Sequence, residues 1–143
     1  MPATDRDINH KVSQWLQYGD EDLVLAKHGL SLKSAVPYRL IAYHAQQCAE
    51  KHLKAYLVFR RTDFPFTHNL ARLIEIAEEV NEWPENFRDA EELTPYAVTT
   101  RYPGEDEPVS AQETIRAIAI AEQTRRIIRK SLVQEGFSAQ TRD

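Results

Sequence analysis

Residues 43–55, YHAQQCAEKHLKA, form the middle of the strongest helical pattern in this sequence. From Pro37 to Arg60 the chain contains no glycine and no second proline, and a proline suits the first turn of a helix because its missing N–H is not needed there. Glu50, Lys51 and Lys54 fall on other faces than the apolar stripe. That stripe recurs at helical spacing and is predicted to be buried: Ile41, Ala45, Cys48, Ala49, Leu53 and Tyr56.

Three further helical patterns flank this segment. The first covers about residues 8–28, and the last covers about residues 110–135 and begins with a capping box. Thr67 is the predicted N-cap of a third helix that ends near residue 80, with Trp83 and Pro84 closing the pattern. Residues 86–100 predict one or two short helices. We therefore expect an all-α fold, an up-and-down bundle of four main helices plus a short extra helix.

Length and composition favour one compact helical domain. The chain has 143 residues, with 42% hydrophobic and 28% charged residues, so it is too apolar for a disordered protein. We expect a single domain over residues 1–143, with a core at about 8–135 and flexible ends. The lone Cys48 excludes an internal disulfide framework. No stretch reaches the roughly 18 apolar residues of a membrane helix, and residues 1–11 lack a signal-peptide core. We expect a cytoplasmic protein without membrane contact.

The charge is unevenly distributed along the chain. The net charge of −4 disfavours a dedicated nucleic-acid binder, yet residues 51–72 carry five basic residues and one acidic residue. Residues 75–92 carry eight acidic residues and one basic residue. A mildly acidic protein can therefore present a locally positive site.

Three blocks of sequence resemble the HEPN domain family. Residues 43–55 resemble the family's second-helix signature, a Gln-Gln pair followed by Glu-Lys and Leu-Lys-Ala. Residues 67–70, THNL, resemble the start of its third helix. Residues 93–96, LTPY, and 101–103, RYP, resemble the stretch before its final helix. The blocks occur in family order, and the resemblance covers roughly Val12 to Leu132.

The resemblance implies a helical bundle that usually dimerises and is often encoded beside a minimal nucleotidyltransferase. Some family members are metal-independent ribonucleases. Their motif is an arginine, four to six residues, and then a histidine, with two copies meeting across the dimer. Other members lack the arginine and have no demonstrated activity. RNA or a nucleotide, a second copy and a nucleotidyltransferase are therefore the implied partners.

Arg61 and His68, separated by six residues, fit that motif at its upper limit. We expect Arg61 at the end of the second helix, where its N–H donors can hold a phosphate. His68 in the first turn of the third helix could move a proton, and the positive end of the helix dipole would favour a neutral imidazole suited to a general base. Asp63 and Asn69 are predicted to support this pair.

A departure from the motif keeps two functions open. Thr62 stands where active members tend to carry Asn, Asp or His. The first hypothesis is the toxin-type, metal-independent RNA endonuclease of a HEPN/minimal-nucleotidyltransferase pair. In the second, Arg60 and Arg61 cap the carbonyls of their helix, His68 is a helix-start residue, and the protein is a non-catalytic dimeric module that binds a nucleotide or a partner.

Further residues are candidates for contacts with RNA or a nucleotide: Lys51, Lys54, Tyr96, Arg101 and Tyr102. The last three suit packing of a short helix equally well. Phe64 and Phe66 are interpreted as core or interface packing, and Glu50 with Lys51 as a solvated or interhelical pair.

His44, Cys48 and His52 lie at four-residue steps on one helix. Their span of about 12 Å is too long for one ion. His44 with Cys48, or Cys48 with His52, could form half a site completed by a partner chain. The interpretation that we favour is Cys48 in a small core position, with no metal and no cofactor.

Overall fold

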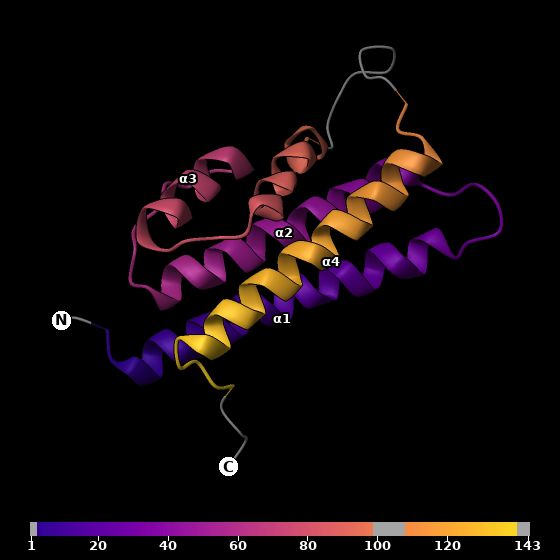
Figure 1. Ribbon diagram of the computed structural model, residues 1–143. Coiled ribbons are helices and arrows are strands. Elements are labelled where there is room, and N and C mark those ends of the chain that lie inside the picture. The colour runs from indigo at the N-terminus through magenta and orange to yellow at the C-terminus, as the bar shows by residue number, and fades with distance from the viewer. Residues whose placement is uncertain (1–2, 99–107, 140–143) are drawn as a thin grey trace.

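The computed structural model describes residues 3–98 and 108–139, and within them it contains five helices and no strand. Helices α1 (Asp5–Leu30), α2 (Tyr38–Phe59) and α4 (Ala111–Gln134) are long and lie side by side (Figure 1). The shorter α3 (Leu70–Val80) and the 3₁₀ helix η1 (Glu85–Ala97) cover α2 on another side and return the chain to the start of α4 (Figure 1). The all-α bundle expected from the sequence is confirmed.

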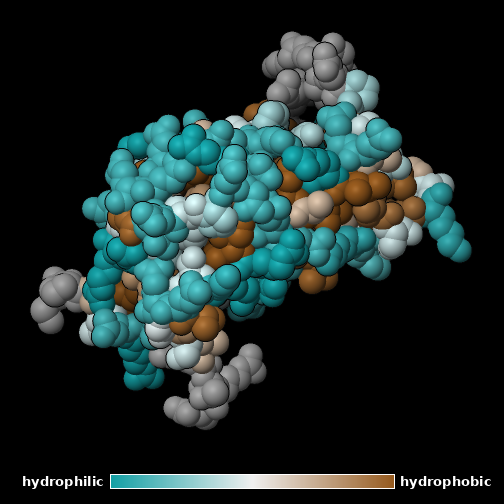
Figure 2. All heavy atoms as spheres, viewed as in Figure 1, coloured by the Kyte–Doolittle hydropathy of each residue, from teal (hydrophilic) through white to brown (hydrophobic). Residues whose placement is uncertain are grey.

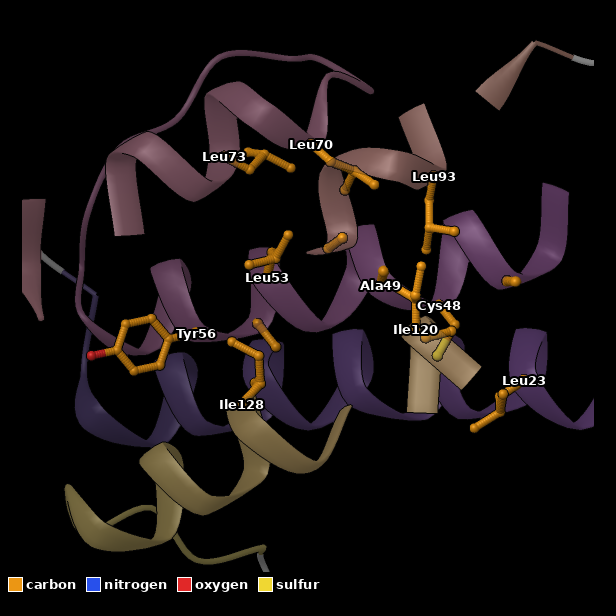
Figure 3. Close-up of a cluster of buried hydrophobic side chains, with 14 of the residues drawn as sticks. Leu23, Cys48, Ala49, Leu53, Tyr56, Leu70, Leu73, Leu93, Ile120 and Ile128 are labelled. Carbon is orange, nitrogen blue, oxygen red and sulfur yellow. The ribbon is translucent and has the colours of Figure 1, made fainter. Parts of the chain in front are cut away.

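Helix α2 is the centre of the bundle, because each of the other helices packs against it. Its buried residues include the whole predicted stripe, from Ile41 to Tyr56. In Figure 3, Leu53 of α2 points toward Leu70 and Leu73 of α3, and the side chains come from every layer of the bundle. The Cys48 side chain is fully buried, and burial raises the pKa of its thiol to about 12. The prediction of a small core position for Cys48 is confirmed, and its thiol is unreactive at neutral pH.

A glycine inside α1 allows α1 and α2 to approach closely. Gly19 is buried, and a Cβ atom at this position would lie 2.8 Å from Nδ1 of His52. His52 is itself fully buried, and its Nδ1 donates a hydrogen bond to the carbonyl oxygen of Cys48 at 2.8 Å. The imidazole therefore occupies the space that a larger residue at position 19 would need.

Several local expectations are wrong. Helix α3 is capped by Asn69, whose side chain accepts the Ala71 N–H, and the Thr67 hydroxyl accepts the Asn69 N–H instead. His68 therefore precedes α3, and the helix-dipole argument for a neutral imidazole does not apply to it. Residues 85–97 form one 3₁₀ helix, within the expectation of one or two short helices, and this helix accommodates Pro95 without a break.

Polar and charged side chains cover most of the face drawn in Figure 2, with patches of apolar side chains among them. Ile115 of α4 is 55% exposed. None of the helices in the described part of the chain is long and apolar enough to span a membrane.

Candidate functional site

A buried carboxylate lies at the centre of the candidate site. Glu50 of α2 is 2% exposed. Its oxygens accept hydrogen bonds from Nδ1 of His68 at 2.9 Å, Nζ of Lys54 at 3.0 Å and Nε2 of Gln46 at 3.1 Å. A buried carboxylate is tolerated where charged and polar donors satisfy it. The expectation that Glu50 is a solvated or interhelical pair with Lys51 is therefore wrong.

His68 is fixed at its backbone and at one ring nitrogen. Nε2 of Gln46 donates to the His68 carbonyl oxygen at 3.3 Å, and the imidazole Nδ1 bonds to Glu50. An ionised carboxylate only accepts, so Nδ1 carries the hydrogen of this bond. The side chain is 58% exposed, and within the described residues Nε2 has no partner. One nitrogen is thus anchored while the other remains available to a substrate.

Lys54 fills the space between Glu50 and three aromatic rings. Its side chain is buried, and its Nζ lies 5.5 Å from the ring centroid of Trp15, 6.0 Å from that of Phe64 and 5.8 Å from that of Phe66. Because its charge is matched by Glu50 and the rings, Lys54 supports the site rather than presenting a free cation to RNA. The sequence pattern, which placed Lys54 away from the core, missed this burial.

The two phenylalanines of this loop differ. Phe64 packs against the hydrophobic core, as expected. Phe66 is 99% exposed, so it does not pack in the core, and packing at an interface stays a prediction for this residue. Its ring lies edge-to-face with the His68 imidazole, with 6.4 Å between the ring centroids and an interplanar angle of 65°.

Arg61 follows the end of α2 in a left-handed conformation, with φ of 54°. The Thr62 N–H bonds to the Leu57 carbonyl and the Arg61 N–H to that of Val58, which is a Schellman motif. This turn directs the Arg61 side chain toward the start of α1, where it donates to the Ala3 carbonyl and to Asp5, each at 2.7 Å. Arg61 therefore contacts α1, and His68 contacts α2.

The expectation that the Arg60 and Arg61 side chains cap the carbonyls of α2 is also wrong. Nη1 of Arg60 donates to Glu135, at 2.8 Å, and to the Tyr56 hydroxyl, at 3.0 Å. The carbonyls of the last turn are instead satisfied by backbone N–H groups.

The other predicted site residues are dispersed. Asp63 is exposed, and Asn69 serves as the N-cap of α3. Lys51 forms an ion pair with Asp22 of α1, which also accepts from Nδ1 of His44. The Tyr96 hydroxyl donates to Glu113 at 3.2 Å. Arg101 and Tyr102 lie outside the described residues.

Comparison with known proteins gives the family. The HEPN domain family model matches residues 12–131, which is most of the chain. The chain belongs to the HEPN domain family. A similar solved structure is the crystal structure of TT1696 from Thermus thermophilus, with 25% sequence identity and a TM-score of 0.72 over 85% of this chain and 98% of that one.

The HEPN fold is also seen in ST0689, described as an archaeal HEPN homologue. Its crystal structure has a TM-score of 0.65 and 21% identity over 85% of this chain and 97% of that one. No curated protein matches the chain. The three sequence blocks therefore identified the family correctly.

A second polar network lies on the other side of α2 in this HEPN domain. Asp20 of α1 accepts from Nε of Arg125 at 2.8 Å and from Nη2 of Arg129 at 2.6 Å, and Nε2 of His52 lies 3.5 Å away. Burial raises the pKa of Asp20, but His52 and the two arginines outweigh it and hold that pKa well below its usual value. We assign most of this lowering to the arginines, because 3.5 Å is long for a hydrogen bond from His52.

Proposed function

We propose that this HEPN protein is a metal-independent RNA endonuclease in which His68 moves the proton. The observation that supports the proposal is the Glu50–His68 hydrogen bond at 2.9 Å, with the imidazole 58% exposed. The hydrogen bond to Glu50 keeps a hydrogen on Nδ1 of His68. Nε2 is then the nitrogen that can accept a proton from a ribose 2′-hydroxyl. That oxygen then attacks the adjacent phosphorus and the bond to the 5′ oxygen breaks. The leaving 5′ oxygen takes a proton from water and His68 releases its proton to solvent, so the products carry a 2′,3′-cyclic phosphate and a 5′-hydroxyl.

Arg61 is the proposed phosphate ligand. Its partner Asp5 has a side chain that is 98% exposed, and the Arg61 side chain is 43% exposed. Exposed ion pairs contribute about 0–1 kcal/mol, so exchanging Asp5 for a phosphate costs little. A guanidinium can bind a phosphate through two parallel N–H donors. In this proposal Arg61 leaves α1 when RNA binds.

The proposal also covers the oligomeric state, the partner protein and the cellular compartment. The family resemblance implies a homodimer in which two such sites approach, and a minimal nucleotidyltransferase as a toxin–antitoxin partner. We propose both for this chain, acting in the cytoplasm on RNA. Asp63 stays a candidate supporting residue because it is exposed and lies between Arg61 and His68 in the chain.

The second candidate function is a non-catalytic module that binds a nucleotide or a partner protein. One observation favours it: Arg61 bonds to Ala3 and Asp5 rather than lying with His68. Thr62, in place of the residue usual in active members, points the same way. In this alternative, Glu50 and His68 fix the loop before α3, and RNA is bound without being cleaved.

RNA cleavage in the presence of a chelator separates the two functions. We expect the wild type to cleave RNA in EDTA. His68→Ala should lose about 100-fold or more of the rate, in the range that a general base contributes. Arg61→Ala should lose about 100-fold as well, because it removes a donor that stabilises the charge on the phosphate. Arg72→Ala and His10→Ala remove exposed side chains of the same types and serve as matched controls. RNA binding without cleavage supports the module, and unchanged cleavage in either site variant refutes the assignment.

A further inference from the structure

An aromatic ring stands exposed beside the proposed proton-transfer group. Phe66 is 99% exposed, whereas Phe64 of the same loop packs against the core. The Phe66 ring centroid lies 6.4 Å from that of His68 and 5.8 Å from Nζ of Lys54. A solvated phenylalanine in this position has apolar surface that a flat ligand could cover.

The loop holds this ring in place from both sides. Phe64 anchors the loop on the core, and Pro65 restricts the backbone between the two phenylalanines. After Phe66, the Thr67 hydroxyl accepts the Asn69 N–H, and the Asn69 side chain caps α3. The ring is therefore displayed by an ordered loop whose next anchored side chain, His68, is held by Glu50.

We propose that Phe66 is a stacking platform for an unpaired base next to the scissile phosphate, so that the substrate is single-stranded RNA. This inference rests on the proposed function, because it places the phosphate at His68. Every base presents a π face that stacks on an aromatic side chain without a sequence requirement. A base inside a duplex is already stacked and cannot cover the ring, so the platform selects loops, ends and other unpaired segments.

The surroundings of Phe66 fit a base better than a protein interface. The core of an interface between proteins collects several apolar side chains. The neighbours of Phe66 include polar or charged groups: Thr67, His68, Asn69 and the ammonium of Lys54. The other rings near that ammonium, Trp15 and Phe64, are partly buried and packed against the core. The other exposed large apolar side chains belong to other segments: Tyr18, Val24, Leu25, Leu32, Leu40, Val98, Ile115 and Val133. One exposed ring beside an exposed imidazole matches the base and the reacting phosphate of one nucleotide.

Binding of a non-cleavable RNA tests the platform. The probe is a fluorescent 2′-O-methyl oligoribonucleotide, titrated as a single strand and as a duplex with its complement. We expect Phe66→Ala to weaken single-strand binding by about 5- to 150-fold, the range measured for loss of one stacked base. Phe66→Trp should bind as well as the wild type, and Phe66→Leu, apolar but not aromatic, should resemble alanine. Leu32→Ala, an exposed apolar residue in the α1–α2 loop at the opposite end of α2, is the control and should change nothing.

Several results would overturn the inference. The first is equal affinity of the wild type and Phe66→Ala for the single strand, or no binding by the wild type. The second is a duplex bound as tightly as the single strand. The third is a change of oligomeric state in Phe66→Ala, measured by sedimentation, which would make Phe66 a contact between copies. Because the probe cannot be cleaved, failed catalysis leaves the binding result intact. Conversely, cleavage that is insensitive to Phe66 would retain the nuclease and reject the platform.

Discussion

Nδ1 of His68 lies 2.9 Å from Oε1 of Glu50, joining the loop before α3 to the buried side of α2. The two residues are 18 positions apart and belong to two of the sequence blocks that resemble the HEPN family. The contact gives the histidine a fixed tautomer and orientation. It also gives Glu50 a positioning role, since the carboxylate acts through the imidazole.

Glu50→Gln should lower the rate of RNA cleavage without lowering RNA affinity. The amide can still accept from His68, but it removes the negative charge that stabilises an imidazolium after proton transfer. We expect a loss of at least about 10-fold in kcat, a part of the 10²–10⁴-fold that a general base supplies. Single-turnover cleavage and binding of the 2′-O-methyl probe measure the two quantities separately.

The control for this variant concerns Lys54, which the substitution leaves buried without its anion. If Glu50→Gln melts at a lower temperature, the double variant Glu50→Gln/Lys54→Met removes both charges and restores a neutral core. A folded double variant that cleaves at the wild-type rate would contradict the positioning role of Glu50.

Asp5→Ala should release Arg61 at little cost to stability. The ion pair is exposed, so we expect a change in the free energy of unfolding of about 1 kcal/mol or less. RNA affinity should rise at low salt, because a competing anion is removed and the guanidinium becomes available. Titrations at two salt concentrations, with chemical unfolding in parallel, check both points. Weaker RNA binding in this variant would argue against Arg61 as a phosphate ligand.

Asp20→Asn should destabilise the fold at pH 7 by about 1–2 kcal/mol, a modest figure because the carboxylate is 35% exposed and partly screened. The pKa of Asp20 is lowered in the folded state, so its contribution is present above the ordinary value of 3.8 and is lost as the pH falls below it. The gap between variant and wild type should therefore shrink as the pH falls from 5 toward 3. Urea unfolding across this pH range measures the difference in the free energy of unfolding, and Asp63→Asn, at an exposed position, is the control. A difference that grows as the pH falls would contradict the prediction.

Gly19→Ala should destabilise the protein by about 1–3 kcal/mol, because its Cβ would lie 2.8 Å from Nδ1 of the buried His52. In a His52→Ala background the same substitution should cost much less, since the imidazole that blocks the space is gone. A double-mutant cycle from thermal or urea unfolding gives the coupling. Equal costs in both backgrounds would show that the two residues do not compete for space.

The helices were predicted well from the sequence, because apolar residues at helical spacing lie on one face of a helix and that face is buried. The second-helix stripe from Ile41 to Tyr56 is buried as expected, and the capping box at Ser110 and Glu113 is present. The start of α3 was misplaced by two residues because Thr67 and Asn69 are both good N-caps. Their competition is settled by how the loop packs, which periodicity does not encode.

The candidate site was predicted less well because its contacts join distant segments. From the sequence alone Glu50 is interpreted as a surface charge, because its contacts with His68 and Lys54 appear only in the folded structure. Arg61 forms an ion pair with Asp5, which is 56 positions away in the sequence. The spacing between Arg61 and His68 contains no information about that partner. One signal was available: the Gln-Gln-x-x-Glu pattern of residues 46–50 places Gln46 and Glu50 on one face of a helix, four residues apart.

The chemistry of the RNA ends tests the central claim most directly. A single-stranded RNA is incubated with the wild type and with His68→Ala in EDTA, and the 3′ ends of the fragments are identified by mass spectrometry. We predict 2′,3′-cyclic phosphate ends from the wild type, and a loss of at least about 100-fold in their rate of formation with His68→Ala. Fragments with 3′-hydroxyl ends, or cyclic phosphates formed equally fast by the folded variant, would contradict the account.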